Sequence, residues 1–105
     1  MKVGRIFELI PETLDRELVE TLVDNKDLCI ERIVSKGHTS PAAGWYDQPK
    51  NEWVIVLVGG ATIVFANETE ISLTAGSYID IPAHTKHRVS WTDPDCETVW
   101  LAVHY

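Results

Sequence analysis

The chain has 105 residues, of which 45% are hydrophobic and 24% are charged, which is the composition of an ordinary globular domain. Sixteen acidic residues against nine basic ones give a formal charge of −7, so the surface should repel phosphate backbones and anionic lipids. We therefore expect a single domain over residues 1–105 that binds neither nucleic acid nor membranes.

The amino terminus does not point to export. Residues 1–20 become strongly charged within a dozen positions and lack the apolar core of a secretory signal. The longest apolar run, residues 53–58, is too short to cross a bilayer. These features predict a cytoplasmic protein.

The two cysteines do not point to a zinc or redox site. Cys29 and Cys96 are too far apart in sequence to form a zinc or redox pair. Each is therefore expected to be a buried free thiol.

One amphipathic helix is predicted near the beginning of the chain. Leu14, Leu18 and Leu22 recur at helical spacing, and acidic residues precede them where the helix dipole favours negative charge. We therefore expect residues 1–27 to form an extension that contains this helix, and residues 28–105 to form the main body.

The main body is predicted to consist of seven or eight short strands separated by turns. Along the first of them, Glu31 alternates with Ile30 and other apolar residues, as in a strand with two different faces. Gly59 and Gly60 separate two apolar runs and predict a tight hairpin. Regular short strands of this kind indicate a sandwich or a small barrel. The predicted strands are residues 28–34, 53–58, 61–66, 71–73, 78–81, 88–91 and 98–104.

The segment GSYIDIPAHTKH, residues 76–87, has a distinctive spacing of glycine, proline and histidine. Five residues separate Gly76 from Pro82, and His87 ends the segment. This pattern resembles the second sequence motif of the cupin family. His84 stands where that motif usually has a second glycine, and Trp91 stands where it often has asparagine.

A segment further upstream resembles the end of the first cupin motif. Glu52 is followed by six residues and a glycine, but the two histidines that precede this glutamate in the full motif are absent. Two alignments of the missing pair are possible. If three residues lie between the pair and Glu52, Tyr46 and Gln48 occupy its positions; if four residues lie between them, Trp45 and Asp47 do. We prefer the first alignment, because a proline then directly follows the pair, as is common in the family.

The resemblance covers roughly residues 44–91 and implies an all-β fold. The implied architecture is a small cupin-type β-barrel, also called a double-stranded β-helix or jelly roll, preceded by the one helix. In the family, three histidines and one glutamate hold a metal ion inside such a barrel. Here the resemblance implies a reduced metal set of Gln48, Glu52 and His87, with Tyr46 and His84 as candidates for proton transfer.

The residue types are compatible with that chemistry. Tyr46 and Gln48 are two positions apart, so they would face the same side of a strand. Divalent transition metals such as iron, manganese, nickel or zinc prefer imidazole and carboxylate ligands. Glu52 and His87 each also have a structural alternative. Glu52 would then be a solvated residue at the end of a strand, and His87 would be a polar residue after a turn. His38 and His104 are expected to be structural, although either would complete the set if it faced inward.

Two classes of function remain from the sequence. The first is a metal-dependent enzyme acting on a small organic substrate by dioxygenation, isomerisation or lysis. The second is a metal-free module that binds or senses a small molecule in the same pocket. The missing histidine pair favours binding, or a non-redox reaction, over oxygen activation. Hydrophobic edge strands also predict a homodimer.

Overall fold

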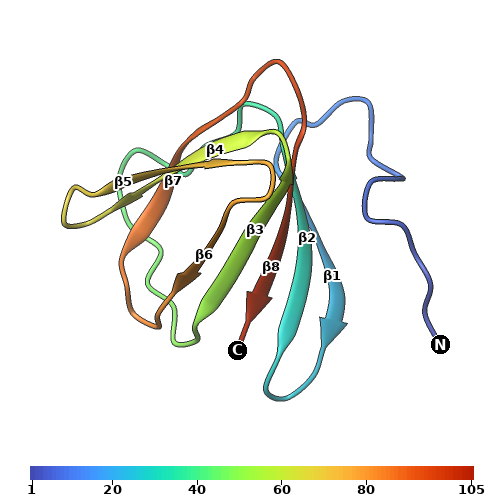
Figure 1. Ribbon diagram of the computed structural model, residues 1–105, viewed down its shortest axis with the longest axis horizontal. Coiled ribbons are helices and arrows are strands. Elements are labelled where there is room, and N and C mark those ends of the chain that lie inside the picture. The colour runs from blue at the N-terminus through green and yellow to red at the C-terminus, as the bar shows by residue number, and fades with distance from the viewer.

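The computed structural model describes residues 1–105 and contains eight strands and no helix (Figure 1). No helix able to span a membrane is present. The strands are β1 (Leu18–Asp24), β2 (Cys29–Ser35), β3 (Glu52–Val58), β4 (Gly60–Phe65), β5 (Glu70–Thr74), β6 (Tyr78–Ile81), β7 (His87–Thr92) and β8 (Thr98–His104).

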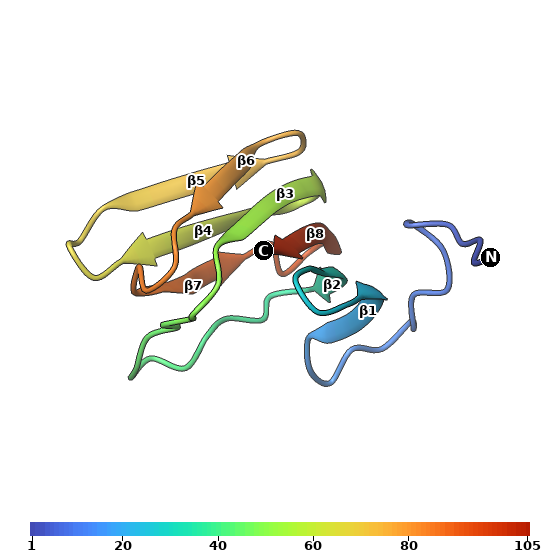
Figure 2. The ribbon, with the colours of Figure 1, turned by 90° about the horizontal axis from the view of Figure 1, so that it is seen from below.

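The strands form two antiparallel sheets that enclose the interior of a flattened barrel (Figure 2). The larger sheet has the order β1-β2-β8-β3-β6, and the smaller sheet has the order β5-β4-β7. Most neighbouring strands are therefore far apart in the sequence, as β2 and β8 are. The arrangement confirms the predicted all-β barrel, and each predicted strand is present with a shift of at most one residue at either end.

The hydrophobic core lies between the two sheets. Val54, Val56 and Trp100 enter it from the larger sheet, and Ala61 and Ile63 enter it from the smaller one. All five side chains are almost completely buried. Alternate residues of each strand point inward, so the positions next to this core on the same strand faces are available to line a cavity.

The predicted helix is wrong, because residues 18–24 form strand β1 instead. The segment LVETLVD fits a strand as well as a helix, since its alternation places Val19, Thr21 and Val23 at every second position. Three of its seven residues are β-branched valine or threonine, which favour strands. Pairing with β2 then decides between the two local possibilities.

A short polar turn makes that pairing possible. The side-chain oxygen of Asn25 accepts hydrogen bonds from the backbone N–H groups of Asp27 and Leu28, at 3.1 and 3.0 Å. This arrangement reverses the chain between the two strands. Leu18 then pairs with Val34, and β1 becomes one edge of the larger sheet.

The predicted hairpin at Gly59 and Gly60 is also wrong. Strands β3 and β4 lie in different sheets, so the chain crosses from one sheet to the other at this point. Gly59 has a φ of +89°, a conformation that glycine adopts without strain. A pair of glycines indicates a sharp change of direction, but the partners of the two strands are fixed by long-range packing.

The cysteines are free, as predicted, but they are not both buried. Cys29 is half-buried on β2, and Cys96 is exposed in the turn before β8. The general tendency of cysteine to be buried therefore fails for Cys96, which lies in an exposed turn.

Candidate functional site

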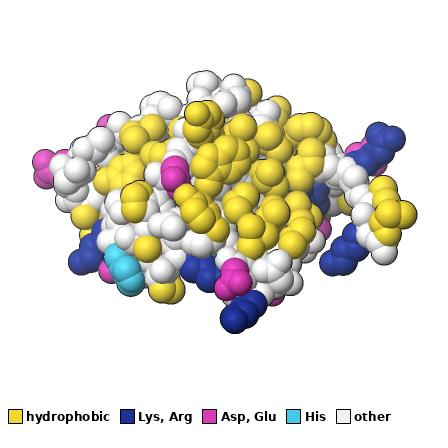
Figure 3. Space-filling view, turned by 60° about the horizontal axis from the view of Figure 1, so that its bottom comes forward, with side chains coloured by type: hydrophobic (Ala, Val, Ile, Leu, Met, Phe, Trp, Pro, Cys, Tyr) yellow, Lys and Arg dark blue, Asp and Glu magenta, His cyan; other side chains and the backbone are white.

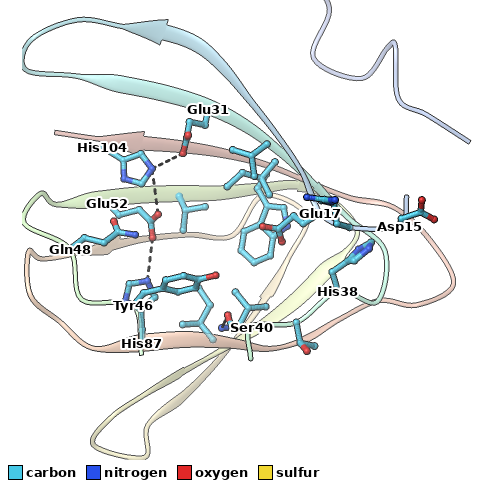
Figure 4. A pocket seen from close by; sticks show the side chains of 18 residues that line it. Asp15, Glu17, Glu31, His38, Ser40, Tyr46, Gln48, Glu52, His87 and His104 are labelled. Carbon is cyan, nitrogen blue, oxygen red and sulfur yellow. Dashed lines mark hydrogen bonds and ion pairs between the residues drawn. The ribbon is translucent and has the colours of Figure 1, made fainter. Parts of the chain in front are cut away.

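A cavity of about 430 Å³ opens between the two sheets, a volume typical of small-molecule sites. Its labelled side chains gather in two groups (Figure 4). Apolar side chains such as Val54 and Trp100 also line it. We call the first group the imidazole end (Glu31, Tyr46, Gln48, Glu52, His87 and His104) and the second the loop end (Asp15, Glu17, His38 and Ser40).

Strands from both sheets place the charged groups of the imidazole end. Glu52 begins β3 and lies opposite His104, which ends β8. Glu31 comes from β2, the other neighbour of β8. His87 begins β7 in the smaller sheet and faces them across the cavity. Four segments that are distant in sequence thus converge at one end of the barrel.

The four side chains form a continuous row of alternating carboxylates and imidazoles (Figure 4). His104 Nε2 lies 2.9 Å from Glu31 Oε1 and 3.7 Å from Glu52 Oε2. The other oxygen of Glu52, Oε1, lies 3.4 Å from His87 Nε2. These side chains are between 6% and 22% exposed, so their charges are screened less than those of surface pairs.

The carbonyl of Thr85 orients the ring of His87, and Glu52 favours its protonated form. Its Nδ1 lies 2.8 Å from the carbonyl oxygen of Thr85 and therefore donates a proton to it. A second proton on Nε2 is then favoured by the facing Glu52 carboxylate. Burial is the largest influence and lowers the pKa of His87, but the hydrogen bonds to Glu52 and Thr85 and the charge of Glu52 together raise the pKa above its ordinary value of 6.5.

This shift predicts how the stability depends on pH. Because the folded-state pKa of His87 is raised, its contribution is fully present below about pH 6.5 and is lost as the pH rises through the folded value. We expect the difference in unfolding free energy between wild type and His87→Gln to shrink from pH 6 towards pH 9. Urea denaturation across this range measures it, and a difference that grows with pH would contradict the assignment.

His38 contributes to the loop end mainly through its contacts with the backbone. Its Nδ1 accepts a hydrogen bond from the N–H of Lys36 at 2.8 Å, so Nε2 carries the proton. Nε2 then donates to the carbonyl oxygen of Leu14 at 3.1 Å. Both ring nitrogens are occupied, and the side chain joins two loops that border the cavity.

Glu17 is held at the loop end by a buried hydrogen-bond chain. The Trp100 indole N–H donates to Ser35 Oγ at 3.2 Å, and Ser35 Oγ donates to Glu17 Oε2 at 2.8 Å. Ser35 is completely buried. The chain therefore holds a carboxylate at the loop end of the cavity, next to Arg16.

The structure brings together four of the five residues predicted for the site. Tyr46, Gln48, Glu52 and His87 all line the cavity, and Tyr46 forms an isolated β-bridge with His87. The rings of these two residues are 5.7 Å apart. His84 does not line the cavity: its side chain is 68% exposed, and its Nδ1 lies 2.8 Å from Asp47 Oδ1.

Sequence reasoning missed Glu31 and preferred a structural role for His104 over a place in the site, yet both belong to the row. A signal for His104 was available, because it lies two and four positions after Ala102 and Trp100, which face the core. No comparable signal identified Glu31. Its apolar neighbour Ile30 faces outward, so apolar character does not indicate which side of β2 lines the cavity.

The metal ion implied by the family resemblance does not fit these residues. No group of three or more histidine, cysteine, aspartate or glutamate side chains is placed to hold one. The two oxygens of Glu52 face two different imidazoles, so the donors lie in a row and do not surround a common point. Of the predicted set, Gln48 would add only a neutral oxygen to Glu52 and His87, which is a thin set for a transition metal.

Comparison with protein families matches residues 32–104 to the cupin domain. The match covers most of the barrel and more than half of the chain. The protein therefore belongs to the cupin family. A search of curated protein sequences finds no match.

Solved structures show the same fold. One is a protein from Ralstonia eutropha JMP134 named a "putative mannose-6-phosphate isomerase", with a TM-score of 0.94 and 42% identity over 99% of this chain and 97% of that chain. An RmlC-like cupin from Desulfovibrio desulfuricans has a TM-score of 0.76 and 18% identity, and covers 99% of this chain and 96% of its own. A cupin superfamily protein from Desulfitobacterium hafniense DCB-2 has a TM-score of 0.74 and 18% identity, covering 90% and 82%.

Proposed function

We propose that this chain binds a small, polar, unphosphorylated organic molecule in the cavity, and that binding does not require a metal ion. The observation that carries the proposal is the row of Glu31, His104, Glu52 and His87 at the imidazole end. Carboxylates accept hydrogen bonds from hydroxyl or ammonium groups, and a protonated imidazole donates them. A molecule with several such groups would therefore find both kinds of partner at one end of the cavity.

The charges of the lining select against phosphate. Four carboxylates line the cavity, and the only arginine or lysine among the lining residues is Arg16, which is exposed. Phosphate sites usually combine basic side chains with helix N-termini or glycine-rich loops, and the structure has no helix. The name of the Ralstonia protein refers to a phosphorylated sugar, but the lining of this cavity favours a neutral or positively charged ligand.

Three sugars that differ in charge test this proposal directly. Mannose 6-phosphate, mannose and mannosamine share one ring and carry a negative, no and a positive charge. We expect calorimetry on chelator-treated protein to show binding of mannosamine at least about tenfold tighter than that of mannose 6-phosphate, because like charges brought together cost several kcal/mol. Tightest binding of mannose 6-phosphate, or binding that appears only after a divalent metal is added, would overturn the proposal.

A second candidate function is proton transfer on a bound sugar. The carboxylate of Glu52 and the imidazole of His87, whose pKa is raised, are neighbours and face the same cavity, as a base and an acid must. Glu52 would take the proton from carbon 2 of an open-chain aldose, and the electron pair of that C–H bond would form the carbon 1–carbon 2 double bond of an enediolate, whose oxygen accepts a hydrogen bond from His87. After exchange with solvent, Glu52 would return the proton to carbon 2. Deuterium uptake at carbon 2 of mannose in D₂O, absent from Glu52→Gln, would support this activity; equal uptake in both proteins would reject it.

A further inference from the structure

The central strands of the five-stranded sheet have their ionisable side chains on the inner side only. Glu52 is the only such residue of β3 and His104 the only one of β8, and both line the cavity. The opposite side of this sheet, which we call the outer face, is apolar in its middle, and Figure 3 shows a broad hydrophobic area there. The strand registers place on it Ile30, Trp53, Ile55, Leu101 and Val103. Because ionisable groups usually point towards water, this reversed arrangement indicates that they serve a ligand inside the barrel.

Each end of the cavity has a pair of carboxylates (Figure 4). The pairs are Glu31 and Glu52 at the imidazole end, and Asp15 and Glu17 at the loop end. Four carboxylates and the single guanidinium of Arg16 give the lining a charge of −3 before its histidines are counted, and protonation of His87 reduces this to −2. A ligand with two positive charges would therefore match the charge of the cavity.

The carboxylates of the loop end have no cationic partner in the chain. Arg16 lies between Asp15 and Glu17 in the sequence but forms no ion pair with either of them. The hydroxyl of the buried Ser35 donates to Glu17 Oε2 at 2.8 Å, and no group of the chain donates to Oε1. Glu17 is thus held by one oxygen, while the other is free to accept a hydrogen bond from a ligand.

The wall of the cavity between the two carboxylate pairs is apolar. Val54 of β3, Ile63 of β4 and Trp100 of β8 contribute buried side chains, and Ile33 and Val89 contribute partly buried ones. In Figure 4, apolar side chains lie between the two labelled groups. A chain of methylene groups would cover this wall without burying any polar group of its own.

Strand β2 indicates the distance between the two ends. Glu31, Ile33 and Ser35 alternate along its inner side, and Ser35 holds Glu17. At about 3.3 Å per residue, Glu31 and Ser35 are roughly 13 Å apart along the strand. With the carboxylates level with these positions, hydrogen bonds of about 2.9 Å at both ends leave roughly 7 Å between two ammonium nitrogens. Since each bond of about 1.5 Å advances an extended chain by about 1.25 Å, about five methylene groups separate two nitrogens by this distance.

We propose that the ligand of the cavity is a short linear α,ω-diamine such as 1,5-diaminopentane. One ammonium group would bind Glu31 and Glu52, the other would bind Asp15 and Glu17, and the methylene chain would lie along the apolar wall. This inference rests on the proposed function, because it takes the cavity as a metal-free ligand site. The loop end is then the second half of the site, which a ligand with a single ammonium group, such as mannosamine, does not use.

Two properties distinguish this class of ligand from other cations. Its charges are at opposite ends of the molecule, as the separated carboxylate pairs require. It also has no carboxylate of its own, which would be repelled by four carboxylates and could pair only with the exposed Arg16. Lysine, which is 1,5-diaminopentane with an added carboxylate, should therefore bind more weakly than the diamine.

Calorimetry on chelator-treated protein at neutral pH tests the proposal with two matched pairs of compounds. The first pair, 1,5-diaminopentane and 5-aminopentan-1-ol, has one length but two and one ammonium groups. We expect the diamine to bind at least about tenfold tighter, because its second ammonium group reaches the loop end. The second pair, 1,3-diaminopropane and 3-aminopropan-1-ol, is too short to reach both ends, so its affinities should differ by no more than about twofold.

A double variant locates the second ammonium group. Asp15→Asn with Glu17→Gln removes both charges of the loop end but keeps an oxygen that accepts from the Ser35 hydroxyl. It should reduce the preference for 1,5-diaminopentane over 5-aminopentan-1-ol to about twofold or less. Glu68→Gln with Glu70→Gln is the matched control, since it removes two charges from exposed positions outside the cavity and should retain the preference.

Each part of the proposal has its own contradicting result. Equal binding of 1,5-diaminopentane and 5-aminopentan-1-ol to wild type, or the same preference in the short pair, would overturn the diamine as the class of ligand. A preference that survives in the loop-end variant, or is lost in both double variants, would overturn the loop end as its second site. Binding of mannosamine would separate these failures from a failure of the proposed function, which would leave neither mannosamine nor the diamine bound.

Discussion

Replacing Glu52 with glutamine is expected to weaken the binding of mannosamine by about 100-fold, because truncating one partner of a buried charge pair costs about 2–5 kcal/mol. Glu52 is the one residue that contacts both imidazoles of the row, His87 through Oε1 and His104 through Oε2. Glutamine keeps the shape of the side chain but removes its negative charge. Calorimetry with mannosamine on wild type and variant measures the effect.

Two further variants make this result specific. Glu31→Gln should weaken binding less than Glu52→Gln, since Glu31 contacts only His104. Glu70→Gln, at an exposed position on β5, should leave binding unchanged. Equal losses for Glu52→Gln and Glu70→Gln would mean that the overall charge of the protein, and not the row, attracts the ligand.

Replacing Gly59 with alanine is expected to lower the unfolding free energy by about 4 kcal/mol, from backbone strain and a steric clash together. A Cβ at this position would lie 2.4 Å from Thr98 Oγ1 and 2.6 Å from Thr98 Cα. The φ of +89° adds strain for any residue with a Cβ. Urea denaturation of the variant and wild type measures the loss.

Gly76 provides a matched control for this substitution. It has the same φ of +89°, but a Cβ there would meet no atom within 4 Å. Gly76→Ala should therefore cost only about 1 kcal/mol, from backbone strain alone. Equal losses in the two variants would contradict the close contact between Gly59 and Thr98 where the chain crosses from β3 to β4.

Most of the barrel was predictable because its strands and turns have strong local signals. Short β-rich segments, turn glycines and the spacing from Gly76 to His87 are enough to indicate the fold. The errors occurred where local patterns allow two structures. Residues 18–24 fit a helix or a strand, and only pairing with β2 selects the strand.

The site was predictable only in part, because the larger sheet is apolar on both sides. Glu52 and His87 were identified by their spacing in the family motifs, and Tyr46 and Gln48 followed from the same alignment. Glu31 was missed because Ile30, its apolar neighbour, occupies the outer face, so hydrophobicity does not indicate which side of β2 faces the cavity. Alternation separates the two faces of a strand without identifying the inner one.

The most direct test of the account is an NMR titration of the histidine side chains with mannosamine. We predict that the ring nitrogen signals of His87 and His104 move together as the sugar is added, because both lie in the row at the imidazole end. The signals of His84, which is exposed and outside the cavity, should remain in place. Unchanged signals of His87 and His104, or shifts confined to His84, would contradict a ligand site inside the barrel.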